Sequence, residues 1–156
     1  MKRGKEKKRI NCILLIDDNA DDNIYNQIII EKMNMTDNIK VAENGIEALN
    51  YLEEDQKPPD LILLDINMPK MNGWEFLEIY RAYCAENKLS SNVVVLASSL
   101  SKEEEQRLDS ISVIASHKIK PLTKSMLEEI SGQYLQNNGS NEKPENVYAG
   151  KHDKLL

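Results

Sequence analysis

Residues 61–73 read LILLDINMPKMNG, an apolar run that ends at the acidic residue Asp65. Two other short runs, at 13–16 and 93–96, are apolar throughout. Strands that are apolar on both faces are typical of a parallel sheet that helices cover on each side. Shorter runs at 39–41 and 112–115 bring the predicted number of strands to five.

Apolar residues at helical spacing lie between these runs. The first predicted helix is marked by Ile24 and Ile28, together with Tyr25, Ile29 and Met33. Ser101 begins an S-x-x-E capping box for the fourth helix, and Thr123 can cap the fifth. Strands that alternate with helices predict right-handed crossovers and an α/β fold with a doubly wound sheet.

Length and charge limit the classes of function. The 156 residues correspond to about one domain. The net charge is −6, with +5 on the first nine residues and −11 on the remainder, which argues against a nucleic-acid partner. We predict a basic disordered arm at 1–9, a folded domain at 10–136 and a flexible polar tail at 137–156.

Apolar stretches are too short for a membrane segment. The longest contain five residues, against the roughly 20 that a helix needs to cross a bilayer. The basic start is followed directly by the acidic pair and not by a long apolar region, so it is not typical of a secretory signal. We therefore predict a cytoplasmic protein with no membrane partner.

Acidic residues follow two of the apolar runs. Asp17 and Asp18 come after the first run, Asp65 ends the third, and Lys120 lies beyond the fifth. The ligand crevice of an open α/β sheet lies beyond the carboxyl ends of its strands, so we expect these side chains to meet. Crowded carboxylates need shifted pKa values or a cation, and hard oxygen ligands suit Mg²⁺. Taken singly, each acid could instead be a turn residue or a helix N-cap.

One carboxylate, a metal ion and a lysine supply what phosphoryl transfer requires, namely positioning and charge neutralisation. Asp65 is the best candidate for the nucleophile because the third strand is predicted to be central in the sheet. Pro121 could follow a cis peptide bond that directs the ammonium of Lys120 over the crevice.

Three segments together carry a resemblance to a known family: ILLIDD at 13–18, LLDINMPKMNG at 63–73, and the Lys120-Pro121 pair. In this order and spacing they resemble the receiver domain of two-component response regulators. The resemblance implies a flavodoxin-like fold with five helices and a five-stranded parallel sheet of order 2-1-3-4-5. It also implies phosphorylation of Asp65 by a histidine kinase or histidine phosphotransfer protein.

The resemblance also implies how a metal ion is held. Asp18 and Asp65 would bind Mg²⁺ through their carboxylates and Asn67 through its backbone carbonyl, while Asp17 would act largely through water. Lys120 would contact the phosphoryl group.

The resemblance also implies roles for residues that act once Asp65 is phosphorylated. The Asn67 side chain and Ser99 would influence the lifetime of the phosphoryl group. Ala97 stands where the family normally carries a Thr or Ser that links phosphorylation to a surface change, and Ser98 is the nearest hydroxyl that could replace it as a phosphate ligand. His117 stands where the family usually has a rotating Tyr or Phe. We therefore treat Ala97, Ser99 and His117 as candidate switch positions.

These observations predict a single-domain, non-enzymatic signalling module that acts on a downstream protein not identified by the sequence. Whether it forms a homodimer stays open. One alternative is a pseudo-receiver that docks without ever being phosphorylated, which Ala97 favours. Another is a phosphatase of the haloacid dehalogenase class, but that class has an acid two residues after the nucleophile, where this chain has Asn67.

Overall fold

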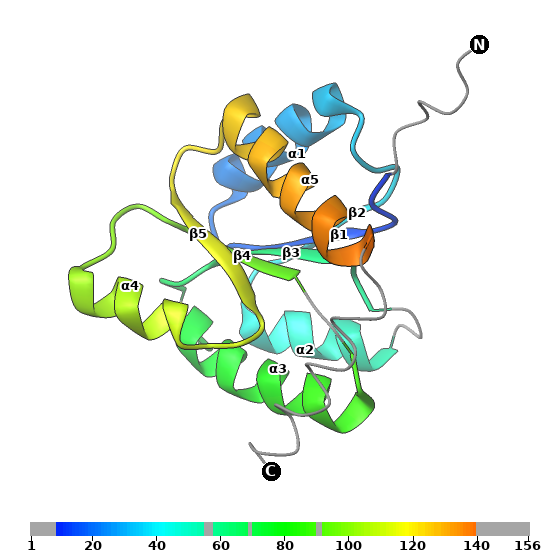
Figure 1. Ribbon diagram of the computed structural model, residues 1–156. Helices are drawn as coiled ribbons and strands as arrows, with labels where there is room; N and C mark the ends of the chain where they lie inside the picture. Colours follow the sequence, from blue (N-terminus) through cyan, green and yellow to red (C-terminus); the bar gives the residue numbers. More distant parts are fainter. Residues whose placement is uncertain (1–8, 55–57, 69, 90–91, 140–156) are drawn as a thin grey trace.

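Strands and helices alternate along the whole described chain, which in this computed structural model comprises residues 9–54, 58–68, 70–89 and 92–139 (Figure 1). The strands are β1 (Ile13–Ile16), β2 (Ile39–Ala42), β3 (Leu61–Asp65), β4 (Asn92–Ala97) and β5 (Ile114–Ile119). The helices are α1 (Ala20–Met33), α2 (Gly45–Glu54), α3 (Gly73–Asn87), α4 (Lys102–Asp109) and α5 (Lys124–Gly139).

All strand pairs are parallel, and the order across the sheet is β2-β1-β3-β4-β5. The predicted flavodoxin-like strand order is therefore confirmed. Helices α1 and α5 cover one face of the sheet, and α2 and α3 cover the other, with α4 next to β5 (Figure 1). The order reverses direction next to β1 and β3, so the ends of these two strands lie side by side at the centre of the sheet.

Alternate residues of the central strands enter two separate core clusters. Leu14 and Ile16 of β1 pack with the apolar residues of α2 and α3, whereas Ile13 and Leu15 pack with those of α1 and α5. All four side chains are almost fully buried. Burial on both faces explains why these strands read as continuous apolar runs in the sequence.

The fifth strand differs from its prediction. It extends over Ile114–Ile119 and not over 112–115. Most of its side chains are only half-buried, because β5 is an edge strand, and polar residues such as Lys118 occupy it. An apolar run was therefore the wrong signal for this strand, and its true end lies directly before Lys120.

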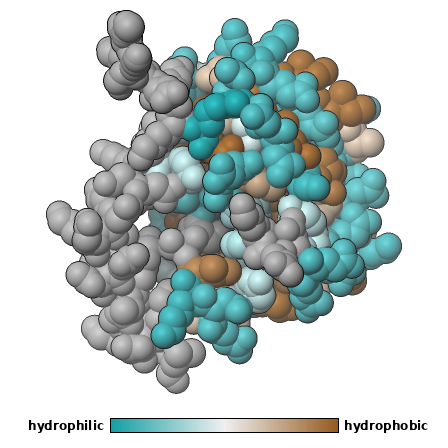
Figure 2. Space-filling view, turned by 90° about the vertical axis from the view of Figure 1, so that its right-hand side faces the viewer, coloured by the Kyte–Doolittle hydropathy of each residue, from teal (hydrophilic) through white to brown (hydrophobic). Residues whose placement is uncertain are grey.

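The predicted apolar residues of α1 contact the core only in part: Ile29 and Met33 pack against it. Ile24 and Ile28 are 57% and 47% exposed, and the buried residues of this helix are Asn23, Asn26 and Ile30. Asn23 is buried because its Nδ2 atom donates a hydrogen bond of 2.9 Å to the backbone oxygen of Asp17. Hydrophobic residues also reach the surface among hydrophilic ones along one margin of the face shown in Figure 2.

Both predicted helix caps are present. The Ser101 and Glu104 side chains each accept a hydrogen bond from the other residue's backbone N–H, at 3.1 and 2.9 Å, which completes the capping box of α4. The Thr123 hydroxyl oxygen accepts from the backbone N–H of Met126 at 3.1 Å. Polar N-caps thus fix where α4 and α5 begin, close to the ends of β4 and β5.

The predicted arm and tail lie mostly outside the described residues. Within them, Arg9 makes an ion pair with Asp37 through two hydrogen bonds of 2.9 and 3.0 Å. Helix α5 runs on to Gly139, past residue 136. No helix of the described segments has the length and apolar character needed to cross a bilayer.

Candidate functional site

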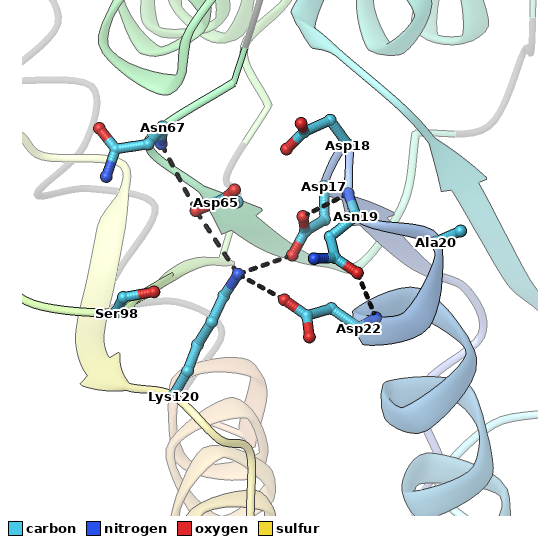
Figure 3. A pocket seen from close by; sticks show the side chains of 9 residues that line it. All are labelled: Asp17, Asp18, Asn19, Ala20, Asp22, Asp65, Asn67, Ser98 and Lys120. Atoms are coloured by element: carbon cyan, nitrogen blue, oxygen red, sulfur yellow. Dashed lines mark hydrogen bonds and ion pairs between the residues drawn. The ribbon is translucent and has the colours of Figure 1, made fainter.

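The carboxyl ends of four strands meet around a cavity of about 490 Å³ (Figure 3). Asp17 and Asp18 follow β1, and Asp65 is the last residue of β3. Ser98 follows β4, and Lys120 follows β5. All five line the cavity, as does Asn67. The structure thus brings together the carboxylates, the hydroxyl and the lysine that the sequence placed at this edge of the sheet.

The acidic cluster offers oxygen ligands to a cation. Asp17, Asp18 and Asp65 each present a carboxylate oxygen within 4.8 Å of the other two. Both oxygens of Asp17 already have protein partners, because Oδ1 accepts from the backbone N–H of Asn19 and Oδ2 from Lys120, each at 2.9 Å. Asp18 is exposed, and its carboxylate points away from Lys120 (Figure 3). This set of carboxylate oxygens fits a hard divalent cation.

Lys120 is the cation of the site. Its Nζ atom lies 2.9 Å from Oδ2 of Asp17, 2.9 Å from Oδ2 of Asp22 and 3.7 Å from Oδ1 of Asp65 (Figure 3). The Lys120–Pro121 peptide bond is cis, as the sequence predicted. Although burial lowers the pKa of Lys120, hydrogen bonds to the carboxylates of Asp17 and Asp22 outweigh burial and raise it above its ordinary value. The ammonium therefore stays charged at neutral pH.

Asp65 has an unusual protonation equilibrium. Burial, followed by the negative charge of Asp17, raises the pKa of its carboxyl group from 3.8 to about 6. Lys120 and a hydrogen bond from the backbone N–H of Asn67, at 3.4 Å, oppose this shift only in part. A buried carboxylate that resists ionisation gains most from a nearby cation, and a reactive group commonly has such a perturbed pKa.

Close packing fixes the loop that follows Asp65. The backbone N–H of Gly73 donates a hydrogen bond of 2.8 Å to the carbonyl oxygen of Ile66. A Cβ atom on Gly73 would lie 2.7 Å from the Cα atom of Ile66, so only glycine fits there without a shift of the backbone. Asn72 and Glu75 then complete a capping box for α3. The loop therefore returns to the end of β3, which holds Asn67 at the cavity.

The three candidate switch positions lie outside this cavity. Ala97 is fully buried among core residues at the end of β4, and Ser99 is exposed. His117 belongs to β5, and its Nε2 atom lies 3.3 Å from Oδ1 of Asp109 on α4. Ser98, and not Ala97, brings a hydroxyl group to the cavity.

Three lining residues escaped the sequence analysis, Ala20 and the two polar residues Asn19 and Asp22. Asn19 is the N-cap of α1, and its side-chain oxygen accepts from the backbone N–H of Asp22 at 3.0 Å. The N-x-x-D pattern at 19–22 resembles a capping box and could have located the start of this helix. It would not have shown that the Asp22 carboxylate turns toward Lys120, because that contact spans 98 residues of sequence.

Comparison with known proteins agrees with this geometry. The family model of the response regulator receiver domain matches residues 13–130. A two-component response regulator from Cytophaga hutchinsonii has a similar structure, with a TM-score of 0.77, 30% identity, and coverage of 83% of this chain and 99% of that one. A response regulator from Legionella pneumophila gives a TM-score of 0.69 and 30% identity, covering 81% and 98% of the two chains.

Relatives of very different lengths contain a segment that is similar to this chain. The probable methanogenesis regulatory protein FilR2 of Methanothrix harundinacea is 32% identical over 131 residues, 79% of this chain and 83% of the relative. The sensor histidine kinase CheAY of Helicobacter pylori is 31% identical over 106 residues, which are 67% of this chain but only 13% of that protein. This chain thus corresponds to a small part of some longer relatives. The family model, the fold and these identities together show that the chain belongs to the response regulator receiver domain family of two-component signalling.

Proposed function

We propose that this chain accepts a phosphoryl group on Asp65 from a histidine kinase or histidine phosphotransfer protein, in a Mg²⁺-dependent reaction. One observation supports this most strongly. The Asp65 carboxylate lies in an open cavity, with carboxylate oxygens of Asp17 and Asp18 within 4.8 Å and the ammonium of Lys120 at 3.7 Å. Such a site combines a nucleophile with fixed positive charge.

The transfer is a displacement at phosphorus. An oxygen of Asp65 attacks the phosphorus atom of a phosphohistidine, an O–P bond forms, the P–N bond breaks, and its electron pair returns to the imidazole. Lys120 neutralises charge on the phosphoryl oxygens. Hydrolysis later reverses the modification: a water oxygen attacks the phosphorus, the O–P bond to Asp65 breaks, and inorganic phosphate and the carboxylate remain, with the displaced proton passing to solvent.

A divalent ion would be held by the carboxylates of Asp18 and Asp65 and by the backbone carbonyl of Asn67, with Asp17 acting through water. When bound, Mg²⁺ supplies positive charge to the phosphoryl oxygens and lowers the barrier to their approach to a carboxylate. Both carboxylate oxygens of Asp17 already accept hydrogen bonds from the protein. This supports a role for Asp17 through water and not as a direct metal ligand.

The signal would leave the domain through contacts with a downstream protein. Ser98 would bind a phosphoryl oxygen from the end of β4, and its position at the cavity supports this role. Ala97, Ser99 and His117 would tune how far phosphorylation changes the surface, through the packing of β4, α4 and β5. The chain would then work as a regulator without an enzymatic activity of its own.

Acetyl phosphate is a direct probe of this proposal. Incubation with acetyl phosphate and Mg²⁺ should add the mass of one phosphoryl group to the intact protein. The gain should disappear in Asp65→Asn and on chelation of the metal, and it should persist in the control Asp21→Asn. No gain at saturating donor would contradict the proposal and favour the alternative of a docking module, for which the missing hydroxyl at Ala97 is the supporting feature.

A further inference from the structure

Lys120 donates hydrogen bonds to two carboxylates, and neither belongs to the proposed phosphoacceptor. Its Nζ atom lies 2.9 Å from both Asp17 and Asp22, whereas the 3.7 Å to Asp65 exceeds a hydrogen-bond distance. An ammonium group has three N–H donors. Two of the three are therefore engaged on the α1 side of the cavity (Figure 3).

The cap of α1 explains why Asp22 is available for Lys120. In α3 and α4, the acidic residue at the third helical position, Glu75 or Glu104, accepts a hydrogen bond from the backbone N–H of its N-cap. In α1 the corresponding N–H, that of Asn19, donates instead to Oδ1 of Asp17 at 2.9 Å. The Asp22 carboxylate is therefore not used by the cap, and its Oδ2 atom reaches Lys120.

The two carboxylates that hold Lys120 differ in burial. The side chain of Asp17 is 6% exposed, whereas that of Asp22 is 40% exposed. If Lys120 leaves, a buried Asp17 loses a charge partner that solvent cannot replace, but Asp22 can be hydrated. Water can thus replace the ammonium as the partner of Asp22 at a modest cost in free energy.

We propose that Asp22 is a positioning residue for Lys120. Its carboxylate holds the ammonium toward α1, so a phosphoryl group on Asp65 must compete with Asp22 for this cation. This inference rests on the proposed function. Asp22 also adds a negative charge to a cavity that must receive an anionic group. It therefore slows phosphoryl uptake and shortens the lifetime of the phosphorylated state.

The substitution Asp22→Asn tests this role because it removes the charge and keeps the side-chain shape. Uptake from acetyl phosphate is followed over a range of donor concentrations at saturating Mg²⁺, and loss of the phosphoryl mass is followed after removal of the donor. We expect the half-saturating donor concentration to fall and the phosphorylated lifetime to rise by about threefold to tenfold. Asp22→Glu, which restores a carboxylate, should return both values toward those of the unaltered protein.

Asp21→Asn is the matched control. Asp21 neighbours Asp22 in the first turn of α1, but it is exposed and does not line the cavity. Normal uptake with an unchanged lifetime in Asp22→Asn would overturn the inference and leave the proposed function intact. Equal changes in Asp21→Asn and Asp22→Asn would overturn it as well, since they would reflect net charge alone. Absence of uptake in every variant would contradict the proposed function and the inference together.

Discussion

The Nζ atom of Lys120 lies 3.7 Å from the Oδ1 atom of Asp65, so an ion pair connects the carboxyl ends of β5 and β3. One ammonium does not offset the charge of all the carboxylates around it. Burial, and then the charge of Asp17, still raise the pKa of Asp65 to about 6. Without a metal ion, the folded protein therefore carries electrostatic repulsion that either a proton or a cation should relieve.

Protonation of the Asp65 carboxylate provides the first test. Because the pKa of Asp65 is about 6 in the folded protein against an ordinary 3.8, the folded state binds more protons between these values. The contribution of Asp65 to the free energy of unfolding should therefore decrease as pH rises from about 4 to about 6 and stay at its lower value above that range. Urea denaturation in chelator, at several pH values, measures this dependence.

Asp65→Asn isolates the contribution of this carboxyl group, since an amide does not titrate. We expect the variant to be more stable than the unaltered protein near neutral pH by about 1 to 3 kcal/mol, with the difference shrinking toward about pH 4. A difference that does not vary with pH would show that Asp65 titrates alike in the folded and unfolded states.

Metal binding provides the second test. Mg²⁺ should raise the free energy of unfolding by about 1 to 3 kcal/mol when its free concentration is about tenfold to a hundredfold above its dissociation constant. Asp18→Ala should abolish this gain, and without metal it should itself stabilise the fold by removing one of the repelling charges. Asp21→Ala should keep the gain. A gain that survives Asp18→Ala would contradict the proposed metal ligands.

Glycine substitutions test the packing behind the site. Gly73→Ala should destabilise the protein by about 1 to 3 kcal/mol, because the new Cβ would lie 2.7 Å from the backbone of Ile66. Gly132→Ala is the matched control within α5, where no atom lies within 4 Å of the added methyl group, and it should stabilise by about 0.5 to 1 kcal/mol. Thermal or urea unfolding compares the two, and equal effects would rule out the close contact as the cause.

Two adjacent serines test the hydroxyl at the end of β4. Ser98 lines the cavity and Ser99 does not. Ser98→Ala should slow phosphoryl uptake by about twofold to tenfold through the loss of one hydrogen bond, while Ser99→Ala should leave the uptake rate unchanged. The rates are measured as phosphoryl mass gained over time from acetyl phosphate. Unchanged uptake in Ser98→Ala would mean that this hydroxyl does not contact the phosphoryl group.

The sequence predicted the central part of the fold well for a physical reason. Strands β1, β3 and β4 are buried on both faces, so the same apolar runs mark both their position and their ends. Because the ends of parallel strands share one edge, the meeting of Asp17, Asp65 and Lys120 could be expected from sequence order alone.

The parts that the sequence missed depend on tertiary contacts. β5 is a half-buried edge strand whose polar residues carry no periodic signal, and α1 buries Asn23 because its amide bonds to the backbone of Asp17. Asp22 is another such case. Its carboxylate would be assigned to a helix cap on sequence grounds, but in the structure it faces Lys120 across the cavity.

The position of the transferred group is the most direct test of the central claim. The protein is treated with acetyl phosphate and Mg²⁺, reduced with borohydride, which converts a phosphorylated aspartate to homoserine, and analysed as peptides by mass spectrometry. The account predicts homoserine at position 65 and at no other aspartate. Homoserine at position 17, 18 or 22, with Asp65 unmodified, would contradict it.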